Sequence, residues 1–563
     1  MSTTDTAVPD DAAVPGLLDW LDGPRSDRGV HTMDAEGAWQ YTPYPELAAR
    51  VRRVAAGLAG AGVVPGDVVS VVHRNGPGFM AAFFGALAAG ATPSPAVPPA
   101  LFQDRAAYTR HLGSILGTAR PRVLLAEPDI AQEWGEELDS LGTPIVPLDD
   151  AFGATADEVP VHTWENGSTA LLQFTSGSSS APKGVEVSLA ALEGQIALLA
   201  RWLRFRDGNA CGTWLPIHHD MGLVGMVLPS LVTQSELWVM QPDQFIGGAA
   251  RWMRLLGSGN VQITSVPPFS LAHVLRRVRA EDLEGCDFSK MLVQVVGAEP
   301  IDSRVLDAYE RLLTPFGWRP GTLSPAYGLA EATLAVTGED LRVPPPGVRV
   351  DRARLRLGEK VVLDTGELPV EEPLELASSG RVLPGVTVEV RDEAGDPVPP
   401  GVLGEIAVGG VALADGYRGH PRWDGAFVTG DAGFFWNDRL HVLGRLGDAL
   451  KVRGVQVFAE DLETVLGELP ELRRVRHAVV LGSLEGQDTA AVLVVKQPGE
   501  WSEPVYRALR RQLRGVRVVV VAANRGAVRR TSSGKPQRRA MFDQLMNGTI
   551  DGVVLHDSGK EEQ

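Results

Sequence analysis

Residues 171–188 read LLQFTSGSSSAPKGVEVS, in which a loop of small hydroxyl residues follows an apolar segment. The preceding STALLQF (168–174) is short and mostly apolar, which predicts a strand. The following SLAALEGQIALLARWL (188–203) predicts a helix with Ser188 as N-cap and one apolar face of Leu189, Leu192, Ile196, Leu199 and Leu203. We therefore expect a loop between a strand and a helix, whose N–H and hydroxyl donors cradle a polyphosphate.

The loop departs from two well-known active-site patterns. The Walker A pattern GxxxxGK[ST] does not fit, because Pro182 precedes Lys183 and Gly184 follows it. An amidase-type serine hydrolase would need a suitable upstream lysine, and no G-x-S-x-G elbow occurs. A flexible surface loop stays open as an alternative to phosphate binding from this stretch alone.

Composition places the loop in a large soluble protein. The chain has 563 residues, of which 44% are hydrophobic and 22% charged. We expect no membrane span, because no run of about 18 uncharged apolar residues occurs. The polar, acidic start MSTTDTAVPDDAAVPG does not resemble a secretory signal. Cys211 and Cys286 are the two cysteines and fit no disulfide framework, so we expect a reduced, cytoplasmic protein.

The pattern along the chain predicts an α/β protein with two main domains. Helix-like and strand-like apolar runs alternate up to about residue 375, which indicates α/β layers with largely parallel sheets. Short strands and turns from Leu376 predict a β-rich subdomain, and the pattern after Arg445 predicts a small, mobile α+β C-terminal domain. We expect a disordered tail at 1–14, an N-terminal domain at 15–445, a C-terminal domain at 446–550 and a tail at 551–563.

Charge is distributed unevenly. The net charge of −17 argues against nucleic-acid binding. Residues 471–540 hold 15 Lys and Arg against 5 Asp and Glu, so this stretch carries +10 and the rest −27. Two interpretations stay open: solvated helix faces, or a basic lobe that attracts a nucleotide or an acidic partner protein.

Seven motifs in order resemble those of adenylate-forming enzymes. They are TSGSSSAPKG (175–184), LPIHHDMGLVG (215–225), VGAEPI (296–301), YGLAEATLAVTG (327–338), TGDAGFF (429–435), GRLGDALKVRG (444–454) and TSSGKPQRR (531–539). The versions with HDMG, GAEP and YGxAEATL resemble the fatty acyl-AMP ligases in particular. The resemblance covers roughly residues 35–545.

The resemblance implies an ATP site. The phosphate loop would hold the β- and γ-phosphates through Thr175, Ser176, Gly177, Ser178, Ser179 and Ser180, with Lys183 adding charge or bracing the loop. The adenine and its surroundings would be contacted by Gly297, Ala298, Glu299, Tyr327, Gly328, Leu329 and Ala330. Asp431 and Arg445 would bind the ribose, and Glu331 would bind Mg2+, which prefers oxygen ligands. Lys535 would reach between the substrate carboxylate and the α-phosphate.

The resemblance also implies an acid substrate and a thiol acceptor. His219 and Asp220 would line the junction between acyl pocket and adenylate; a metal site at His218–Asp220 is the weaker alternative. Residues 221–232 would form a wall of the acyl pocket or ordinary core. Residues 339–375 resemble an insertion that the fatty acyl-AMP ligases carry, which implies transfer to a phosphopantetheinylated acyl carrier protein. The resemblance implies a medium- or long-chain fatty acid, and an unusual short or aromatic acid stays open. An acyl-CoA ligase stays open because Lys451 is present, and a non-catalytic adenylate-binding protein is the third hypothesis.

Two positions depart from the family pattern. Ser180 replaces a glycine, and a positive φ there would cost about 1 kcal/mol, which predicts weaker ATP binding or a shifted loop. Gly447 replaces a residue that is usually charged, and it is our candidate for the hinge between the domains; a simple tight turn is the alternative.

Lys535→Ala should lower acyl-AMP formation by at least about a hundredfold, because a charged contact to the transition state is lost. ATP binding and folding should change little, since the lysine would act on developing charge. Pyrophosphate release measures the first, and nucleotide titration the second. Near-normal adenylation by this variant would contradict the role of Lys535.

Overall fold

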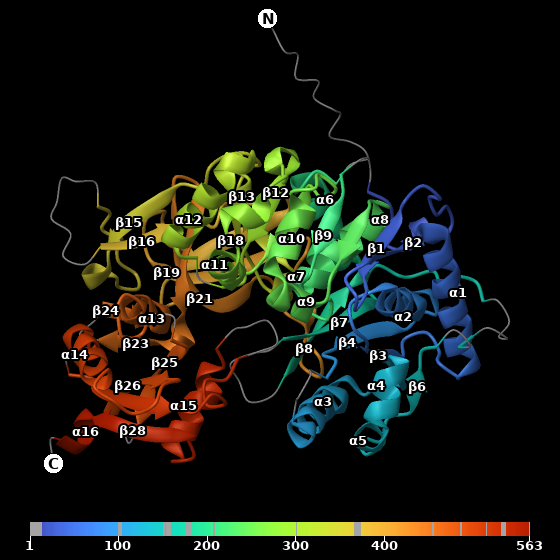
Figure 1. Cartoon of the computed structure of the whole chain (residues 1–563). Coiled ribbons are helices and arrows are strands. Elements are labelled where there is room, and N and C mark those ends of the chain that lie inside the picture. The colour runs from blue at the N-terminus through green and yellow to red at the C-terminus, as the bar shows by residue number, and fades with distance from the viewer. Residues whose placement is uncertain are drawn as a thin grey trace, which may run out of the picture.

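The computed structural model describes residues 14–99, 104–149, 152–153, 159–175, 182–205, 209–299, 301–364, 373–452, 455–473, 475–484, 487–513, 515–530 and 536–561. The predicted disordered tail lies outside these ranges except for Val14, which packs against the largest core. None of the described helices is long and apolar enough to cross a membrane. The fold is α/β with a large and a small domain, as the sequence predicted (Figure 1).

The large domain is built on a nine-stranded sheet. Its order is β17-β14-β13-β12-β11-β9-β10-β1-β2, and the six strands from β13 to β1 run parallel. The bounds are β17 Arg381–Val382, β14 Ala335–Gly338, β13 Leu323–Gly328, β12 Val293–Val296, β11 Ile263–Val266, β9 Cys211–Thr213, β10 Leu237–Val239, β1 Gly29–Met33 and β2 Trp39–Pro43. Functional groups are expected at the carboxyl ends of such parallel strands.

A second, fully parallel sheet lies beside the first. Its order is β4-β3-β5-β6, with β4 Thr92–Ala96, β3 Val68–Val72, β5 Val123–Ala126 and β6 Ile145–Pro147. The helices α1 Tyr44–Gly60, α2 Pro77–Ala88 and α3 Arg105–Ala119 accompany it. The predicted helices at 47–63 and 78–90 and the strands at 67–74 and 122–127 are therefore confirmed.

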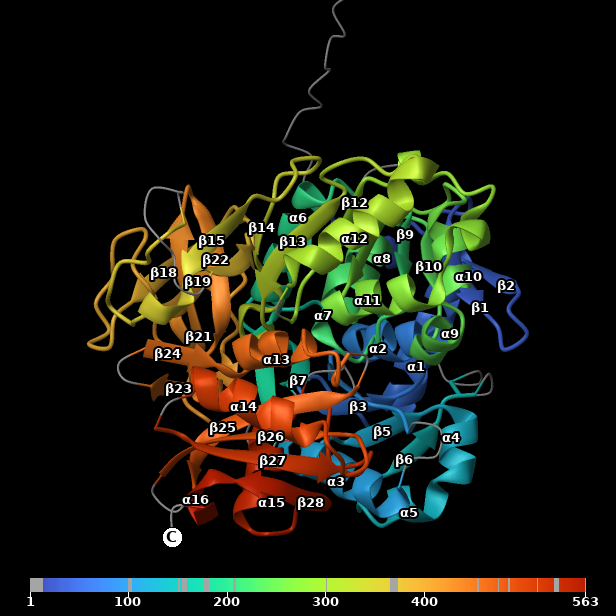
Figure 2. The same cartoon turned by 60° about the vertical axis from the view of Figure 1, so that its left-hand side comes forward.

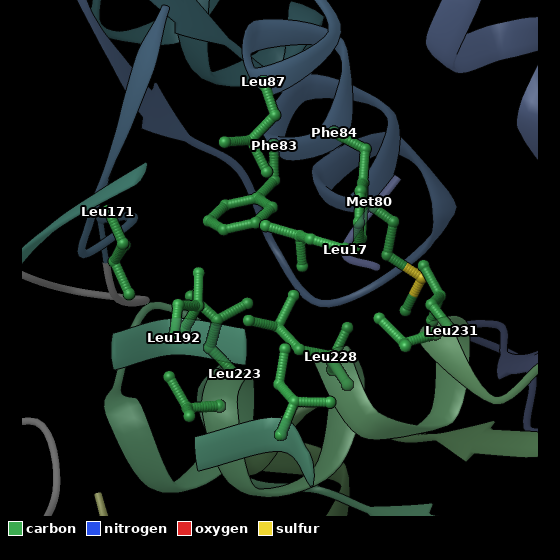
Figure 3. Close-up of a cluster of buried hydrophobic side chains, with 14 of the residues drawn as sticks. Leu17, Met80, Phe83, Phe84, Leu87, Leu171, Leu192, Leu223, Leu228 and Leu231 are labelled. Carbon is green, nitrogen blue, oxygen red and sulfur yellow. The ribbon is translucent and has the colours of Figure 1, made fainter. Parts of the chain in front are cut away.

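The buried helix α2 packs on the segment that follows the HHD sequence. Figure 3 shows Phe83 and Leu87 of α2 facing Leu223 and Leu228, all within one buried cluster. That segment forms α7 Asp220–Gly222, the π-helix η2 Leu223–Val227 and α8 Leu228–Val232. The core thus fixes the segment that carries Asp220, and π-helical turns are frequent at functional sites.

The serine-glycine loop joins two strands, so the predicted strand-to-helix connection is wrong. β7 Thr169–Thr175 and β8 Lys183–Ser188 form an antiparallel hairpin in which Thr175 faces Lys183. The helix α6 Leu189–Trp202 begins only after β8, and its predicted N-cap is confirmed because Ser188 Oγ accepts from the Ala191 N–H at 3.4 Å. GVEVS alternates over too few residues to predict a strand by itself.

The predicted β-rich subdomain is confirmed. It is an antiparallel sheet of order β18-β19-β21-β22, formed by Val386–Arg391, Gly404–Gly410, Phe427–Trp436 and Arg439–Arg445. Within 339–375, β15 Gly347–Asp351 pairs with β16 Pro373–Ala377.

The small domain follows η8 Leu446–Asp448 and the hairpin of β23 Ala449–Val452 with β24 Val455–Phe458. Its sheet has the order β25-β26-β27-β28, with His477–Leu484, Gln487–Val494, Arg517–Ala523 and Gly552–Asp557. The helices α13 Ala459–Gly467 and α14 Ser502–Gln512 pack on one face, and α15 Arg538–Met546 packs on the other. This domain lies below the β-rich subdomain in Figure 1 and again in the turned view of Figure 2.

The prediction of a tail at 551–563 is wrong for the described residues. β28 pairs with β27, and Arg517 Nε donates to Asp557 Oδ1 at 2.8 Å with both side chains over 90% buried. As an edge strand, β28 leaves Val553 and Val554 half exposed. It therefore lacks the regular apolar alternation that predicts a strand.

Candidate active site

One large cavity of about 1990 Å³ lies between the two domains. Every described residue that the sequence assigned to ATP or acid binding lines it. These are Thr175, Lys183, His219, Asp220, Gly297, Ala298, Glu299, Tyr327, Gly328, Leu329, Ala330, Glu331, Asp431 and Arg445. Ser176, Gly177, Ser178, Ser179, Ser180 and Lys535 lie outside the described residues, and Gly447 does not line the cavity.

Asp431 holds the centre of the proposed nucleotide end. The hydroxyl of Tyr327 donates to Asp431 Oδ2 at 2.6 Å, and Arg445 Nε donates to Oδ1 at 3.2 Å. Asp431 and Arg445 are direct partners across β21 and β22. A carboxylate oxygen can accept more than one hydrogen bond. Both oxygens of Asp431 can therefore accept a further hydrogen bond, one from each hydroxyl of a ribose.

The protonation states around Asp431 are well defined. Burial and the neighbouring Asp431 carboxylate hold the pKa of Tyr327 well above its usual value, so its hydroxyl stays a donor. Burial alone would lower the pKa of Arg445, but Asp431 and Glu331 outweigh it and raise that pKa. The group therefore presents an oriented carboxylate between two permanent donors.

Glu331 is buried in the turn η6 Ala330–Ala332. Tyr417 donates its hydroxyl to Glu331 Oε1 at 2.6 Å, and burial followed by the Glu331 charge raises the pKa of Tyr417. Tyr417 comes from β20 Gly416–Tyr417, which pairs with β8 beside the phosphate loop. The sequence analysis did not predict a role for Tyr417, because the residues next to it in the sequence form no pattern that indicates contact with Glu331.

Lys183 is packed at the base of the same loop. Its Nζ lies 4.7 Å from the centre of the Tyr417 ring. Such a contact is attractive because the ring face is electron-rich. Lys183 is therefore held in place against Tyr417, and it also lines the cavity. Both predicted roles, bracing the phosphate loop and adding positive charge, remain possible for it.

A magnesium ion fits the chemistry of Glu331. Mg2+ is commonly held by one or two carboxylates together with substrate phosphates. Glu331 brings one hard-oxygen donor into the cavity beside the phosphate-loop hairpin. Among the residues that the structure describes, no group of three or more His, Cys, Asp or Glu is placed to hold a metal.

The HHD sequence separates into an enclosed ring and two cavity-lining residues. His218 Nε2 is shielded from solvent, and desolvation holds the pKa of His218 well below its usual value. His219 and Asp220 line the cavity. Beyond them Met221 and Met226 also line it, while other residues of 221–232 belong to the core. The two predictions for this segment, pocket wall and core, thus each describe one of its faces.

An apolar slot extends the cavity from this junction. Its floor is the sheet face, where Ser265 of β11 is in register with Val295 of β12, and Ala326 of β13 lies nearby. Its walls include Leu199, Trp202 and Leu203 of α6 together with Leu334. Trp202 is fixed there because its indole N–H donates to the Glu339 carbonyl at 2.9 Å. These wall residues were not predicted from the sequence, since their helical spacing is equally typical of core.

The backbone after β12 is strained where the adenine would lie. Ala298 has a φ of 72°, which is uncommon for a residue with a side chain. A Cβ on Gly297 would lie 2.8 Å from the Ala326 carbonyl oxygen, so a glycine is required there. Strained backbone of this kind concentrates at functional sites.

The small domain contributes a charged wall. Arg538 at the start of α15 contacts Glu460 at 2.7 Å, Glu463 at 3.0 Å and Asp448 at 3.6 Å. All four side chains line the cavity, as do Arg530 and Pro536, the described residues on either side of 531–535. The described residues on either side of the segment that contains Lys535 therefore both reach this cavity.

Gly447 is not required by local sterics. A Cβ built on it would meet no atom within 4 Å, and its φ is not among the positive values. Gly447 lies in the turn η8, so the tight-turn alternative stays open, although this turn does not require a glycine.

The chain belongs to the family of AMP-binding enzymes, whose family model matches residues 24–418. It is 27% identical to the long-chain-fatty-acid–AMP ligase FadD26 of Mycobacterium tuberculosis, over 95% of this chain and 97% of that protein. A putative acyl-CoA synthetase of Caulobacter vibrioides is 28% identical over 96% of both chains. A structure from studies of fatty acyl-adenylate ligases of E. coli and L. pneumophila superimposes with a TM-score of 0.86 at 25% identity, covering 95% of this chain and 98% of that one.

The Arg538 cluster predicts a pH effect on stability. Burial, with repulsion from Glu463 and Asp448, outweighs the attraction of Arg538 and raises the pKa of Glu460 from 4.5 to about 7. Because the folded pKa is the higher one, the contribution of Glu460 to stability is fully present below pH 4.5 and is lost as pH rises through 7.

Glu460→Gln should therefore flatten the pH dependence. Its stability relative to the wild type should rise between about pH 5 and 8, by about 2 to 3 kcal/mol at the upper end. Calorimetric melting at several pH values measures this, with the exposed Glu500→Gln as the charge-matched control. A difference from the wild type that is the same at every pH would contradict the burial of charge at Glu460.

Proposed function

We propose that this enzyme activates a carboxylic acid, most simply a fatty acid, as its acyl-AMP and passes the acyl group to an acyl carrier protein. The observation that carries the proposal is the cavity shared by the Tyr327–Asp431–Arg445 group, Glu331 and the apolar slot. One end suits a nucleotide and the other a hydrophobic acid. The names of the full-length relatives support the same chemistry.

In the first step, an oxygen of the substrate carboxylate attacks the α-phosphorus of ATP, and pyrophosphate leaves. Both reactants are negative, so catalysis comes from positioning and charge neutralisation. Asp431 and Arg445 would orient the ribose, Glu331 would hold Mg2+, and Lys183 would support the phosphate loop. Mg2+ would supply neutralising charge at the phosphates. Lys535 would place its ammonium group between the two reacting groups.

In the second step, the thiol of a phosphopantetheine arm attacks the acyl carbon, and AMP leaves. His219 and Asp220 line the same cavity as the apolar slot, and we assign them to the place where the acyl carbon would lie. A non-catalytic role for the chain is disfavoured, because the described candidates for nucleotide binding all line one cavity.

The resemblance of residues 339–375 to the insertion of the fatty acyl-AMP ligases favours a carrier protein over free coenzyme A as acceptor. This segment contacts both domains. The Leu403 N–H of the large domain donates to the Glu359 carbonyl at 3.0 Å. From the small domain, the Gln456 N–H donates to the Leu355 carbonyl at 2.9 Å, and Gln512 Oε1 accepts from Arg352 Nη2 at 2.7 Å. Lys451, on which the coenzyme A alternative depended, is exposed and paired with Glu393 at 3.0 Å.

The acyl-CoA ligase is the second candidate, because one relative carries the name putative acyl-CoA synthetase. A direct comparison of acceptors separates the two. Free coenzyme A should be the poorer acceptor against a phosphopantetheinylated carrier at equal thiol concentration, with pyrophosphate release measured in parallel to show equal supply of acyl-AMP. Equal turnover of both thiols would favour the acyl-CoA ligase.

Gly447→Pro should separate the two steps if Gly447 is the hinge. Proline fixes φ near about −65° and would lock one orientation of the small domain. Gly447→Ala is the matched control, because its Cβ meets open space. We expect the alanine variant to form acyl-AMP normally, and the proline variant to lose transfer to the carrier while it keeps pyrophosphate release, or the reverse.

Pyrophosphate release and acylation of the carrier from preformed acyl-AMP are measured separately on protein shown to be folded. Parallel loss of both steps in the proline variant, or loss of neither, would rule out Gly447 as the hinge.

A further inference from the structure

A group of exposed arginines surrounds one corner of the small domain. We call Arg473, Arg476, Arg525, Arg529 and Arg530 the arginine rim. Arg473 follows α13, Arg476 precedes β25, and the other three follow β27. Arg473 and Arg530 also line the cavity. Two residues of the rim therefore reach the cavity of the proposed active site, and the others lie on the outer surface of the small domain.

The rim is one connected surface. Arg476 Nη2 donates to the Val528 carbonyl at 2.7 Å, which ties the start of β25 to the loop after β27. The Gln537 N–H donates to the Arg529 carbonyl at 3.0 Å, which ties the same loop to the residues before α15. Val528 is buried under this loop, so its backbone is well supported.

Most of the rim keeps its positive charge uncompensated within the ranges that the structure describes. Arg473, Arg476, Arg525 and Arg529 form no ion pair with any carboxylate in the described part of the chain. Partial burial, with repulsion from Arg530 and Arg525, lowers the pKa of Arg476. Like charges are thus held together on a protein whose net charge is −17, and an anionic partner would relieve that repulsion.

The shape of the rim favours a protein over a small anion. Its guanidinium groups are exposed and come from separate segments, whereas a bound phosphate needs donors that converge in a pocket. Spread positive charge of this kind steers an acidic protein surface and fixes its orientation. A partner held there would lie beside the cavity in which the acyl-AMP would form.

We infer that the arginine rim is the docking surface for a negatively charged face of the acyl carrier protein. This inference rests on the proposed function. The rim acts by attraction before transfer, so it contributes to capture of the carrier and not to the formation of acyl-AMP.

The test uses the full-length enzyme and the phosphopantetheinylated carrier that it acylates fastest in a panel of acidic carriers. The double variant Arg525→Glu/Arg529→Glu avoids both residues of the rim that line the cavity. We expect the KM for this carrier to rise at least about tenfold at low salt with kcat within about twofold. Pyrophosphate release, and acyl transfer to free pantetheine, should stay at wild-type rates because neither involves the carrier surface.

Arg511→Glu is a control on the same domain that reverses one charge, where the double variant reverses two. Arg511 is exposed on α14, and this helix packs on the sheet face opposite to that covered by Ala527 and Val528. It should leave the KM for the carrier unchanged. Salt supplies a second readout: raising it from about 50 to about 500 mM should weaken carrier use by the wild type far more than by the double variant.

Each outcome decides the inference. An unchanged carrier KM in the double variant, or an equal effect of Arg511→Glu, would overturn the arginine rim while leaving the proposed function intact. Impaired pyrophosphate release would assign the rim to the nucleotide instead. Failure of the wild type to acylate any carrier, while it forms acyl-AMP, would overturn the transfer step and with it the docking surface.

Discussion

The carboxylate of Asp431 is the point at which the separately folded parts of the chain meet. Tyr327 reaches it from the nine-stranded sheet, and Arg445 reaches it across the β21–β22 pair. Arg445 is also the last residue of β22 before the chain continues into the small domain. The group of Tyr327, Asp431 and Arg445 therefore forms only when the β-rich subdomain is docked against the main sheet. The small domain begins within a few residues of this group.

The small domain carries a second polar centre that complements the first. Arg538 is shared by Asp448, Glu460 and Glu463, so a single guanidinium joins the turn after Arg445 to α13 and α15. One positive charge does not neutralise three carboxylates that are largely shielded from water, and ion pairs in such surroundings are weak sources of stability. Their value here is geometric, because the group fixes the start of α15 only three residues beyond Lys535. It also makes the stability of the domain depend on pH near neutrality.

Local sequence patterns predicted correctly the segments for which a helix or strand was named. These segments form α1, α2, β3 and β5 of the four-stranded parallel sheet region, β7, α6 with its cap Ser188, and the main elements of the small domain. No individual strand of the nine-stranded sheet was predicted. The failures occurred where a strand is short or lies at an edge. The residues of β8 resemble part of a loop, and those of β28 resemble a tail. Both segments form strands because they pair with β7 and β27, and their own residues do not indicate these pairings.

The same division holds for the candidate site. The sequence by itself determined the motif residues, since side-chain chemistry such as the carboxylate of Glu331 or the phenol of Tyr327 is a local property. It also determined the concentration of positive charge in the last part of the chain. Only the tertiary structure decided that Tyr417, 86 residues from Glu331, donates to its carboxylate, and that Trp202 closes over the strand that contains Gly338. Such contacts depend on how separate layers pack, and no periodicity within a single segment carries that information.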